Sequence, residues 1–198
     1  MRLVAPDTID LDAPGFEAAC RGLANLVAPF EPSVLVGIAT GGVRVAEEVQ
    51  RHLPGSPPLL TVKLQRPGTG VKQKLQFGIV LSRLPVRVTN GMRWLEVAAR
   101  ERTVSRHPAA RQLAVAEAAF ESAGGRALLS PRARVLVVDD TVDSGRTMAT
   151  AVNRLRHIEP RLAIRTAVLT STFRNPPLCP DYCLWTRTLL RFPWSLDS

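Results

Sequence analysis

The stretch Val135–Thr147, VLVVDDTVDSGRT, constrains the fold more than any other part of the chain. It opens with a short apolar run of mainly β-branched residues, which suits a strand buried on both faces of a parallel sheet. Asp139 and Asp140 follow where this strand is expected to leave the core, and a polar turn then leads into a predicted helix, Met148–Arg156. The segment therefore predicts a strand, a turn and a helix of an α/β fold.

The turn in this segment suits a phosphate group. A tight turn that opens a helix aims backbone N–H groups and the positive end of the helix dipole at one point. Gly145 allows close approach of the backbone, and Arg146 adds positive charge. Ser144 and Thr147 add hydroxyl donors. The neighbouring aspartates suit a ligand with adjacent hydroxyls, or its magnesium ion. A sugar phosphate therefore explains both the turn and the aspartates, whereas a purely structural turn would gain nothing from these carboxylates.

The same segment resembles the ribose-5-phosphate signature of type I phosphoribosyltransferases, although Thr141 stands where that family usually has an aliphatic residue. The resemblance implies that Asp139 and Asp140 hold the ribose hydroxyls of phosphoribosyl pyrophosphate (PRPP) and its Mg²⁺ ion. It also implies that the turn holds the 5′-phosphate. The PRPP-binding residues implied here are Asp139, Asp140, Asp143, Ser144, Gly145, Arg146 and Thr147.

A second unit of the same kind lies earlier in the chain. The apolar strand Val34–Ile38 runs into Thr40, Gly41 and Gly42, and a helical pattern, Val43–His52, follows. Two such units predict a doubly wound, mainly parallel sheet with helices on both faces and ligands at the carboxyl ends of the strands. By the family resemblance, Thr40, Gly41 and Gly42 would bind pyrophosphate.

Other segments complete the predicted sheet and its cover. An amphipathic helix is predicted over Pro14–Val27, with Asp12 as its N-cap. The strand Leu59–Leu64 carries Lys63 near its end. Lys63 resembles a pyrophosphate-contacting position of the family, and an ordinary solvated charge at a strand edge is the alternative.

Basic charge is concentrated in one part of the chain. Residues 63–111 hold eleven Lys or Arg but two acidic residues, an excess equal to the +9 net charge of all 198 residues. We expect a lid and a basic helical insertion over about 65–126, with helical patterns at Gly91–Arg102 and Pro108–Glu121. Dimerisation, nucleic-acid binding, contact with an anionic membrane and plain solvated helix faces all remain open for this insertion.

The C-terminal part resembles the hood of xanthine-guanine and related 6-oxopurine phosphoribosyltransferases. A Pro-Trp pair, which follows a base-contacting strand in those enzymes, is matched by Phe192-Pro193-Trp194 within a hood of about 174–198. Leu189 and Leu190 would then lie against the base. Aromatic packing onto the core is the alternative reading.

Asp143 indicates the class of base. By the resemblance, 6-oxopurine enzymes carry an aspartate there as the proton acceptor, so Asp143 is the candidate catalytic residue. The purine-clamping lysine expected after Leu169 is missing, because Thr170, Ser171 and Thr172 stand there, with Arg174 just beyond as a possible substitute. The base, and whether turnover is retained, stay open.

The first functional hypothesis is a Mg²⁺-dependent enzyme that transfers ribose 5-phosphate from PRPP to a purine-like base and releases pyrophosphate. The alternative is a non-catalytic PRPP-sensing regulator that binds RNA or DNA through the basic insertion. We expect a single domain over 1–198, a homodimer, no membrane span and a cytoplasmic location. Cys20, Cys179 and Cys183 lack metal-ligand spacing and are expected to be free thiols.

Overall fold

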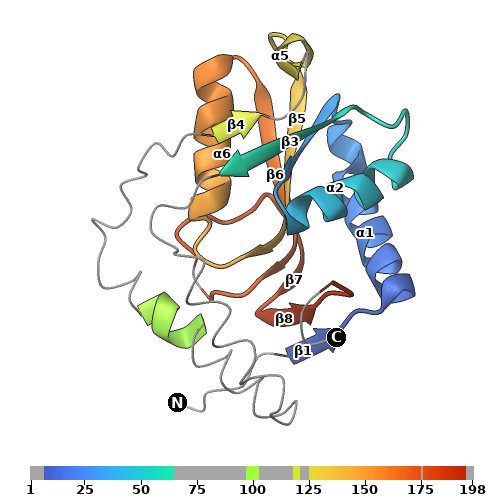
Figure 1. Cartoon of the computed structure of the whole chain (residues 1–198), viewed down its shortest axis with the longest axis vertical. Helices are drawn as coiled ribbons and strands as arrows, with labels where there is room; N and C mark the ends of the chain where they lie inside the picture. Colours follow the sequence, from blue (N-terminus) through green and yellow to red (C-terminus); the bar gives the residue numbers. More distant parts are fainter. Residues whose placement is uncertain (1–6, 65–96, 103–117, 121–124, 175, 195–198) are drawn as a thin grey trace.

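The computed structural model describes residues 7–64, 97–102, 118–120, 125–174 and 176–194 (Figure 1). Its main sheet has the strand order β4-β3-β2-β5-β6-β7, and each neighbouring pair is parallel except β3 with β4. This confirms the predicted doubly wound sheet. The strands are β2 (Val34–Ile38), β3 (Leu59–Leu64), β4 (Ala118–Phe120), β5 (Arg134–Val142), β6 (Ala163–Ser171) and β7 (Tyr182–Thr186).

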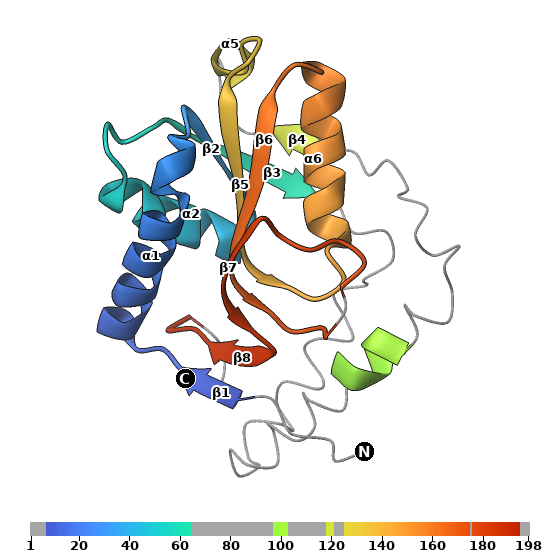
Figure 2. The same cartoon turned by 180° about the vertical axis from the view of Figure 1, so that it is seen from behind.

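Helices cover both faces of this sheet (Figures 1 and 2). The helices α1 (Ala13–Val27) and α2 (Gly41–His52) pack on one face, and α6 (Arg146–Ile158) packs on the other. Because successive side chains of a strand point to opposite faces, Leu136 joins the core under α1 and α2, whereas Val137 joins the core under α6. The apolar run of the signature is therefore buried on both sides. Two short helices, η1 (Ala28–Phe30) and α5 (Gly125–Leu128), lie in connections.

The helix α1 begins as its sequence predicts. Asp12 is the N-cap, and its Oδ1 accepts a hydrogen bond of 2.8 Å from the backbone N–H of Gly15. The free thiol of Cys20 lies buried on this helix, and burial together with the charge of Glu48 raises the pKa of Cys20 to about 12. This thiol is therefore protonated and unreactive at neutral pH.

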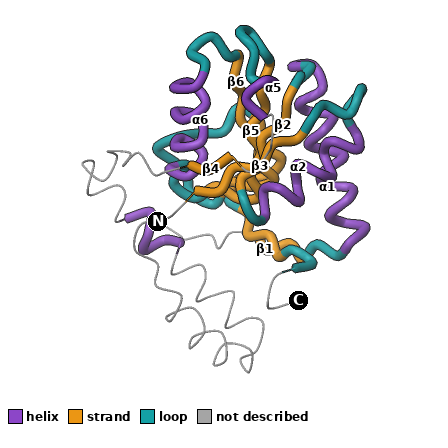
Figure 3. Tube along the Cα trace, turned by 45° about the horizontal axis from the view of Figure 1, so that its top comes forward, coloured by secondary structure: helices purple, strands orange, loops and turns teal. Residues whose placement is uncertain are grey.

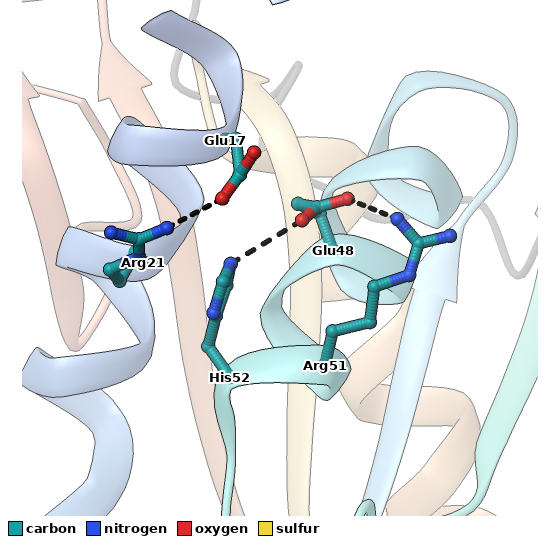
Figure 4. Close-up of polar contacts among 5 residues, drawn as sticks. All are labelled: Glu17, Arg21, Glu48, Arg51 and His52. Carbon is teal, nitrogen blue, oxygen red and sulfur yellow. Dashed lines mark hydrogen bonds and ion pairs between the residues drawn. The ribbon is translucent and has the colours of Figure 1, made fainter. Parts of the chain in front are cut away.

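Charged side chains on α1 and α2 pair within their own helices (Figure 4). Glu17 and Arg21 of α1 are 2.5 Å apart. On α2, Glu48 lies 2.5 Å from Arg51 and 3.3 Å from His52. These five residues, which we call the α1–α2 cluster, make local contacts at helical spacing, and an exposed ion pair of this kind, such as Glu17 with Arg21, is worth only a few tenths of a kcal/mol.

A second, two-stranded sheet lies beyond the carboxyl ends of β5 and β6 (Figures 1 and 2). It pairs β1 (Asp7–Asp10) with β8 (Thr188–Arg191) in parallel. The end of β6 holds it in place, because the Thr170 hydroxyl donates to the Thr188 carbonyl at 2.7 Å and the Arg187 N–H donates to the Ser171 carbonyl at 2.6 Å. The small sheet thus sits over the edge where ligands were expected.

The C-terminal aromatic residues pack onto the core. Trp194 stacks on Phe192 with ring centroids 4.8 Å apart, and its ring meets Phe16 of α1 edge-on at 4.9 Å. The guanidinium of Arg44 lies over the same indole, 4.9 Å from its centroid. Of the two readings offered by the sequence, the structure supports core packing for Phe192 and Trp194.

The insertion differs in part from its predicted structure (Figure 3). Residues 97–102 are helical, in agreement with the pattern Gly91–Arg102. The helix predicted over Pro108–Glu121 is wrong at its end, because Ala118–Phe120 forms β4 and pairs antiparallel with β3. Pairing there satisfies backbone groups along the open edge of β3, which overrides the local helical pattern.

The lid and most of the basic insertion lie outside the described residues, as does the end of the hood after Trp194. Within the described ranges, no helix combines the length and the apolarity that crossing a bilayer requires.

Candidate functional site

The site is built where β2 ends beside β5. The two strands pair in parallel, with Gly37 opposite Val138, so the turn that follows β2 meets the carboxyl-terminal part of β5. Gly41 lies against the carboxylate of Asp140. A Cβ on Gly42 would lie 2.7 Å from the carbonyl oxygen of Val138 and 2.8 Å from the Cα of Asp139. The predicted pyrophosphate turn and the predicted ribose carboxylates are therefore in contact, and only glycine fits between them.

Both carboxylates are oriented by the backbone. The strand β5 continues to Val142, so Asp139 and Asp140 lie within it instead of beyond its end, and both are half-buried. Asp139 Oδ1 accepts from the N–H of Asp140 at 3.0 Å, and Asp140 Oδ1 accepts from the N–H of Thr141 at 2.7 Å. These bonds fix the direction of each carboxylate.

The donor set suits magnesium bound together with a substrate. Among the described residues, no group of three or more His, Cys, Asp and Glu side chains is placed to hold a metal ion. Mg²⁺ is usually held by one or two carboxylates together with water and phosphate oxygens of the substrate. Asp139 and Asp140 fit that pattern, because they are adjacent oxygen ligands beside the predicted phosphate-binding turns.

The helices α2 and α6 both begin at this edge without a capping side chain. Thr40 is the N-cap of α2 and Gly145 the N-cap of α6, and neither makes a side-chain hydrogen bond to the first turn. In α1, by contrast, Asp12 fills this role. First-turn N–H groups have no acceptor inside a helix, so these two helix ends present donors that favour an anion.

Gly145 is required by the shape of the turn. Its φ is 74°, in the left-handed region, and a Cβ there would lie 2.6 Å from the carbonyl oxygen of Leu178. Ser144 and Thr147 on either side are half-buried, and Arg146 is exposed. The turn predicted from the sequence is therefore present, and a second reason for its glycine, the approach of Leu178, was not foreseeable from the motif.

Lys63 lies on the strand next to the pyrophosphate turn. The backbone N–H of Ala39 donates to the carbonyl of Val62 at 3.0 Å, so β3 runs beside the residue that precedes Thr40. Lys63 follows Val62 directly, and its side chain is exposed. The sheet thus brings Lys63 to the same edge as Thr40, and its contact with pyrophosphate stays a prediction.

Asp143 is held by residues from two distant parts of the chain. Its Oδ1 accepts a hydrogen bond from the hydroxyl of Thr172 at the end of β6. Its Oδ2 lies 3.5 Å from the guanidinium Nη1 of Arg100 in the helical segment 97–102. The neighbouring Glu101 accepts a 2.8 Å bond from the backbone N–H of Arg174. The sequence does not predict Thr172 and Arg100 as partners of Asp143, because no local spacing signals either contact.

The three residues in the place of the expected lysine have other tasks. Thr170 binds the small sheet through Thr188, the carbonyl of Ser171 accepts from Arg187, and Thr172 binds Asp143. The departure from the family pattern is thus used to join β6 to the hood and to the candidate catalytic carboxylate.

The predicted base-contacting residues are spread over the hood. Leu190 packs against the core cluster under α1 and α2, while Leu189 is its half-buried neighbour on β8. The Arg174 residue is exposed beyond β6, with its backbone anchored to Glu101. Contact of Leu189, Leu190 or Arg174 with a base stays a prediction.

We call the group formed by Gly41, Gly42, Asp139, Asp140, Asp143 and Thr172 the site rim.

Solved structures share this fold. A purine phosphoribosyltransferase from Pyrococcus horikoshii has a TM-score of 0.59 at 18% identity, over 95% of this chain and 94% of that one. A protein from Neisseria gonorrhoeae with bound ppGpp has 0.58 at 15%, over 96% and 90%. The Helicobacter pylori xanthine-guanine-hypoxanthine phosphoribosyltransferase has 0.57 at 13%, over 96% and 93%.

Sequence comparison points to the same family. No curated protein is similar enough in sequence to add to this result. The model of the phosphoribosyl transferase domain, however, matches residues 11–177, which include both strand-turn-helix units and the whole site rim. The chain therefore belongs to the phosphoribosyl transferase domain family.

Proposed function

We propose that the protein transfers ribose 5-phosphate from PRPP to a 6-oxopurine base and releases pyrophosphate, with Mg²⁺. The observation that carries the proposal is the contact of Gly41 and Gly42 with Asp139 and Asp140, between two uncapped helix starts. Such an arrangement combines anion-binding N–H groups with carboxylates that accept from hydroxyls. PRPP carries phosphate groups and ribose hydroxyls on one small molecule and so matches it.

Each part of the site has a task in this reaction. The turn at Gly145 would bind the 5′-phosphate, and the turn at Gly41, with Lys63, would bind pyrophosphate. Asp139 and Asp140 would bind the ribose hydroxyls and the metal ion. Mg²⁺, when bound, neutralises charge on the leaving pyrophosphate.

The chemistry needs a proton acceptor near the base. A ring nitrogen of the purine forms a bond to the anomeric carbon, the bond from that carbon to pyrophosphate oxygen breaks, and the nitrogen loses its proton. Positive charge develops on the ribose in the transition state, and nearby carboxylates stabilise it. Asp143 is the candidate acceptor, because it is half-buried and directly follows β5, the strand that carries the ribose carboxylates. The purine phosphoribosyltransferases that share the fold support a purine-like base.

The test combines binding and turnover. Millimolar PRPP with Mg²⁺ is expected to raise the melting temperature, because a ligand that binds the folded state stabilises it by mass action. Hypoxanthine, guanine, xanthine, adenine and orotate are then screened for pyrophosphate release, and an oxopurine is expected to react. Asp139→Asn with Asp140→Asn is expected to abolish both signals.

A matched control removes two carboxylates elsewhere. Glu17→Gln with Glu48→Gln changes the charge equally on the α1–α2 cluster and is expected to leave the PRPP-induced shift intact. A wild-type protein that shows no shift contradicts PRPP binding. A shift without pyrophosphate release from any base contradicts the transferase and leaves PRPP as an effector.

A further inference from the structure

Thr172 occupies a position from which it can control the geometry of Asp143. We propose that Thr172 is a positioning residue that holds Oδ1 of Asp143 back and turns Oδ2 toward the base. The inference rests on the proposed function, since it concerns the carboxylate assigned there as proton acceptor. It adds a residue that neither the signature motif nor the hood pattern contains.

Thr172 is itself firmly held. It is buried, with 9% of its surface exposed, and its backbone N–H donates to the carbonyl of Val142 at 2.9 Å. Just before it, Ser171 pairs with Val142 at the end of the β5–β6 ladder. The hydroxyl is therefore carried by the residue that directly follows two paired strands and is anchored to one of them.

The hydroxyl proton has one good acceptor. Thr172 Oγ1 lies 3.5 Å from the carbonyl oxygen of Val142, at the outer limit for a hydrogen bond, whereas its contact with Asp143 Oδ1 is much shorter. A hydroxyl has a single proton to donate, so it is given to Asp143. This bond also fixes the rotation of the carboxylate.

The other carboxylate oxygen faces a weaker partner. Oδ2 of Asp143 lies 3.5 Å from Arg100, whose side chain is 59% exposed. An exposed ion pair at this distance is screened by solvent and orders its partners little. The two oxygens are thus held unequally: Oδ1 is bound by a buried threonine, whereas Oδ2 lies near the exposed Arg100. Under the proposed function, Oδ2 is the oxygen that would accept the proton of the base.

The main experiment compares a variant that loses the hydroxyl of Thr172 with one that keeps it. Thr172→Val keeps the shape and loses the donor, and we expect kcat to fall about 10–100-fold, because small misplacement of a reacting group costs up to about 100-fold. The KM for PRPP and the PRPP-induced melting shift stay at wild-type values. Thr172→Ser keeps the donor and is expected to restore most of kcat.

A matched control lies on β6, the strand that Thr172 directly follows. Thr166 of β6 donates from its hydroxyl to Asp181 Oδ2 at 2.8 Å, and Asp181 is not part of the site rim. Thr166→Val therefore removes the same kind of bond, and we expect it to lower the melting temperature without changing kcat. Arg100→Gln is expected to change kcat less than Thr172→Val does.

A double-mutant cycle separates positioning from general loss of structure. If Thr172 acts through Asp143, Thr172→Val has no further effect on kcat in an Asp143→Ala background. A structural role gives equal fold-losses in both backgrounds, which would overturn the proposal. Wild-type kcat in Thr172→Val overturns it too, while the proposed function stands. A wild type that binds PRPP but turns over no base overturns both.

Discussion

The α1–α2 cluster and the site rim both gather charged side chains, but they do so in opposite ways. In the α1–α2 cluster, each ion pair joins residues three or four positions apart on one helix, as Glu17 with Arg21 does. At the site rim, Asp143 meets Thr172 across 29 positions, and its other carboxylate oxygen lies near Arg100 of the segment 97–102. Local pairs follow from helical spacing and contribute little, whereas the long-range contacts exist only in the folded chain and bring together the groups that the proposed chemistry needs.

The substitution with the largest expected effect tests whether the site rim takes part in catalysis. Asp143→Ala is expected to lower kcat by about 10²–10⁴-fold with the oxopurine that wild type accepts, because a positioned proton acceptor is lost. The PRPP-induced melting shift stays, since backbone N–H groups at the start of α6 are proposed to bind the 5′-phosphate. Steady-state pyrophosphate release and thermal melts measure the two quantities. An Asp143→Ala protein as fast as wild type would remove both its catalytic role and the main reason for favouring an oxopurine.

Much of the fold was predictable because its signals are local. The apolar runs gave β2 and β5, the apolar spacing and Asp12 gave α1, and the glycine turns marked the starts of α2 and α6. These features depend on residues within a few positions of one another, so the sequence carries them directly.

The failures have a common physical cause. The strand β4 was predicted as a helix because its pairing with β3 crosses more than fifty positions, which no local pattern reports. The Asp143 contacts with Thr172 and Arg100 were missed for the same reason. That Leu190 also packs against the core under α1 and α2 was not signalled either, because the pairing of β8 with β1 places it there, and its contact with a base stays a prediction.

Two glycine substitutions, one at the site rim and one on α1, compare how tightly the two regions are packed. Gly42→Ala is expected to lower the free energy of unfolding by about 1–3 kcal/mol, because the new Cβ would meet the Val138 carbonyl and the Asp139 backbone at under 3.0 Å. The PRPP-induced shift is expected to fall as well. Gly22→Ala on α1 places its Cβ 3.5 Å from Leu184, an ordinary contact, and is expected to stabilise by up to about 1 kcal/mol. Denaturant titrations measure both, and equal effects would contradict the tight fit at Gly42.

Asp181 tests whether a contact between residues distant in the sequence must serve the proposed function, because its long-range contacts lie outside the site rim. It accepts from the guanidinium of Arg165 at 2.7 Å and from the N–H and hydroxyl of Thr166 at 2.8 Å, and none of these three residues belongs to the site rim. Burial raises the pKa of Asp181, but these hydrogen bonds outweigh burial and hold the pKa below its usual range. The bonds therefore stabilise the fold above the unfolded pKa of about 4, and this contribution is lost as pH falls through the folded pKa.

Asp181→Asn is accordingly expected to lower the free energy of unfolding by about 1 kcal/mol near pH 7, with the side chain 30% exposed and partly screened. The difference from wild type is expected to shrink below about pH 4, and the PRPP-induced shift is expected to stay unchanged. Urea titrations at pH 7 and at pH 3 measure this. A pH-independent difference would mean that Asp181 acts through packing and not through its charge.

The smallest expected effect lies in the α1–α2 cluster itself. The side chain of Arg21 is 58% exposed and that of Glu17 is 50% exposed, and their pair spans one helical turn. Glu17→Gln, Arg21→Gln and the double variant are expected to give a coupling energy of about 0.3–0.5 kcal/mol, because solvent screens an exposed pair. In 1 M NaCl the Debye length falls to about 3 Å, so the coupling is expected to vanish. A coupling above about 1 kcal/mol that survives high salt would show that this face holds its charges as firmly as the site rim does, and the contrast between the two regions would fail.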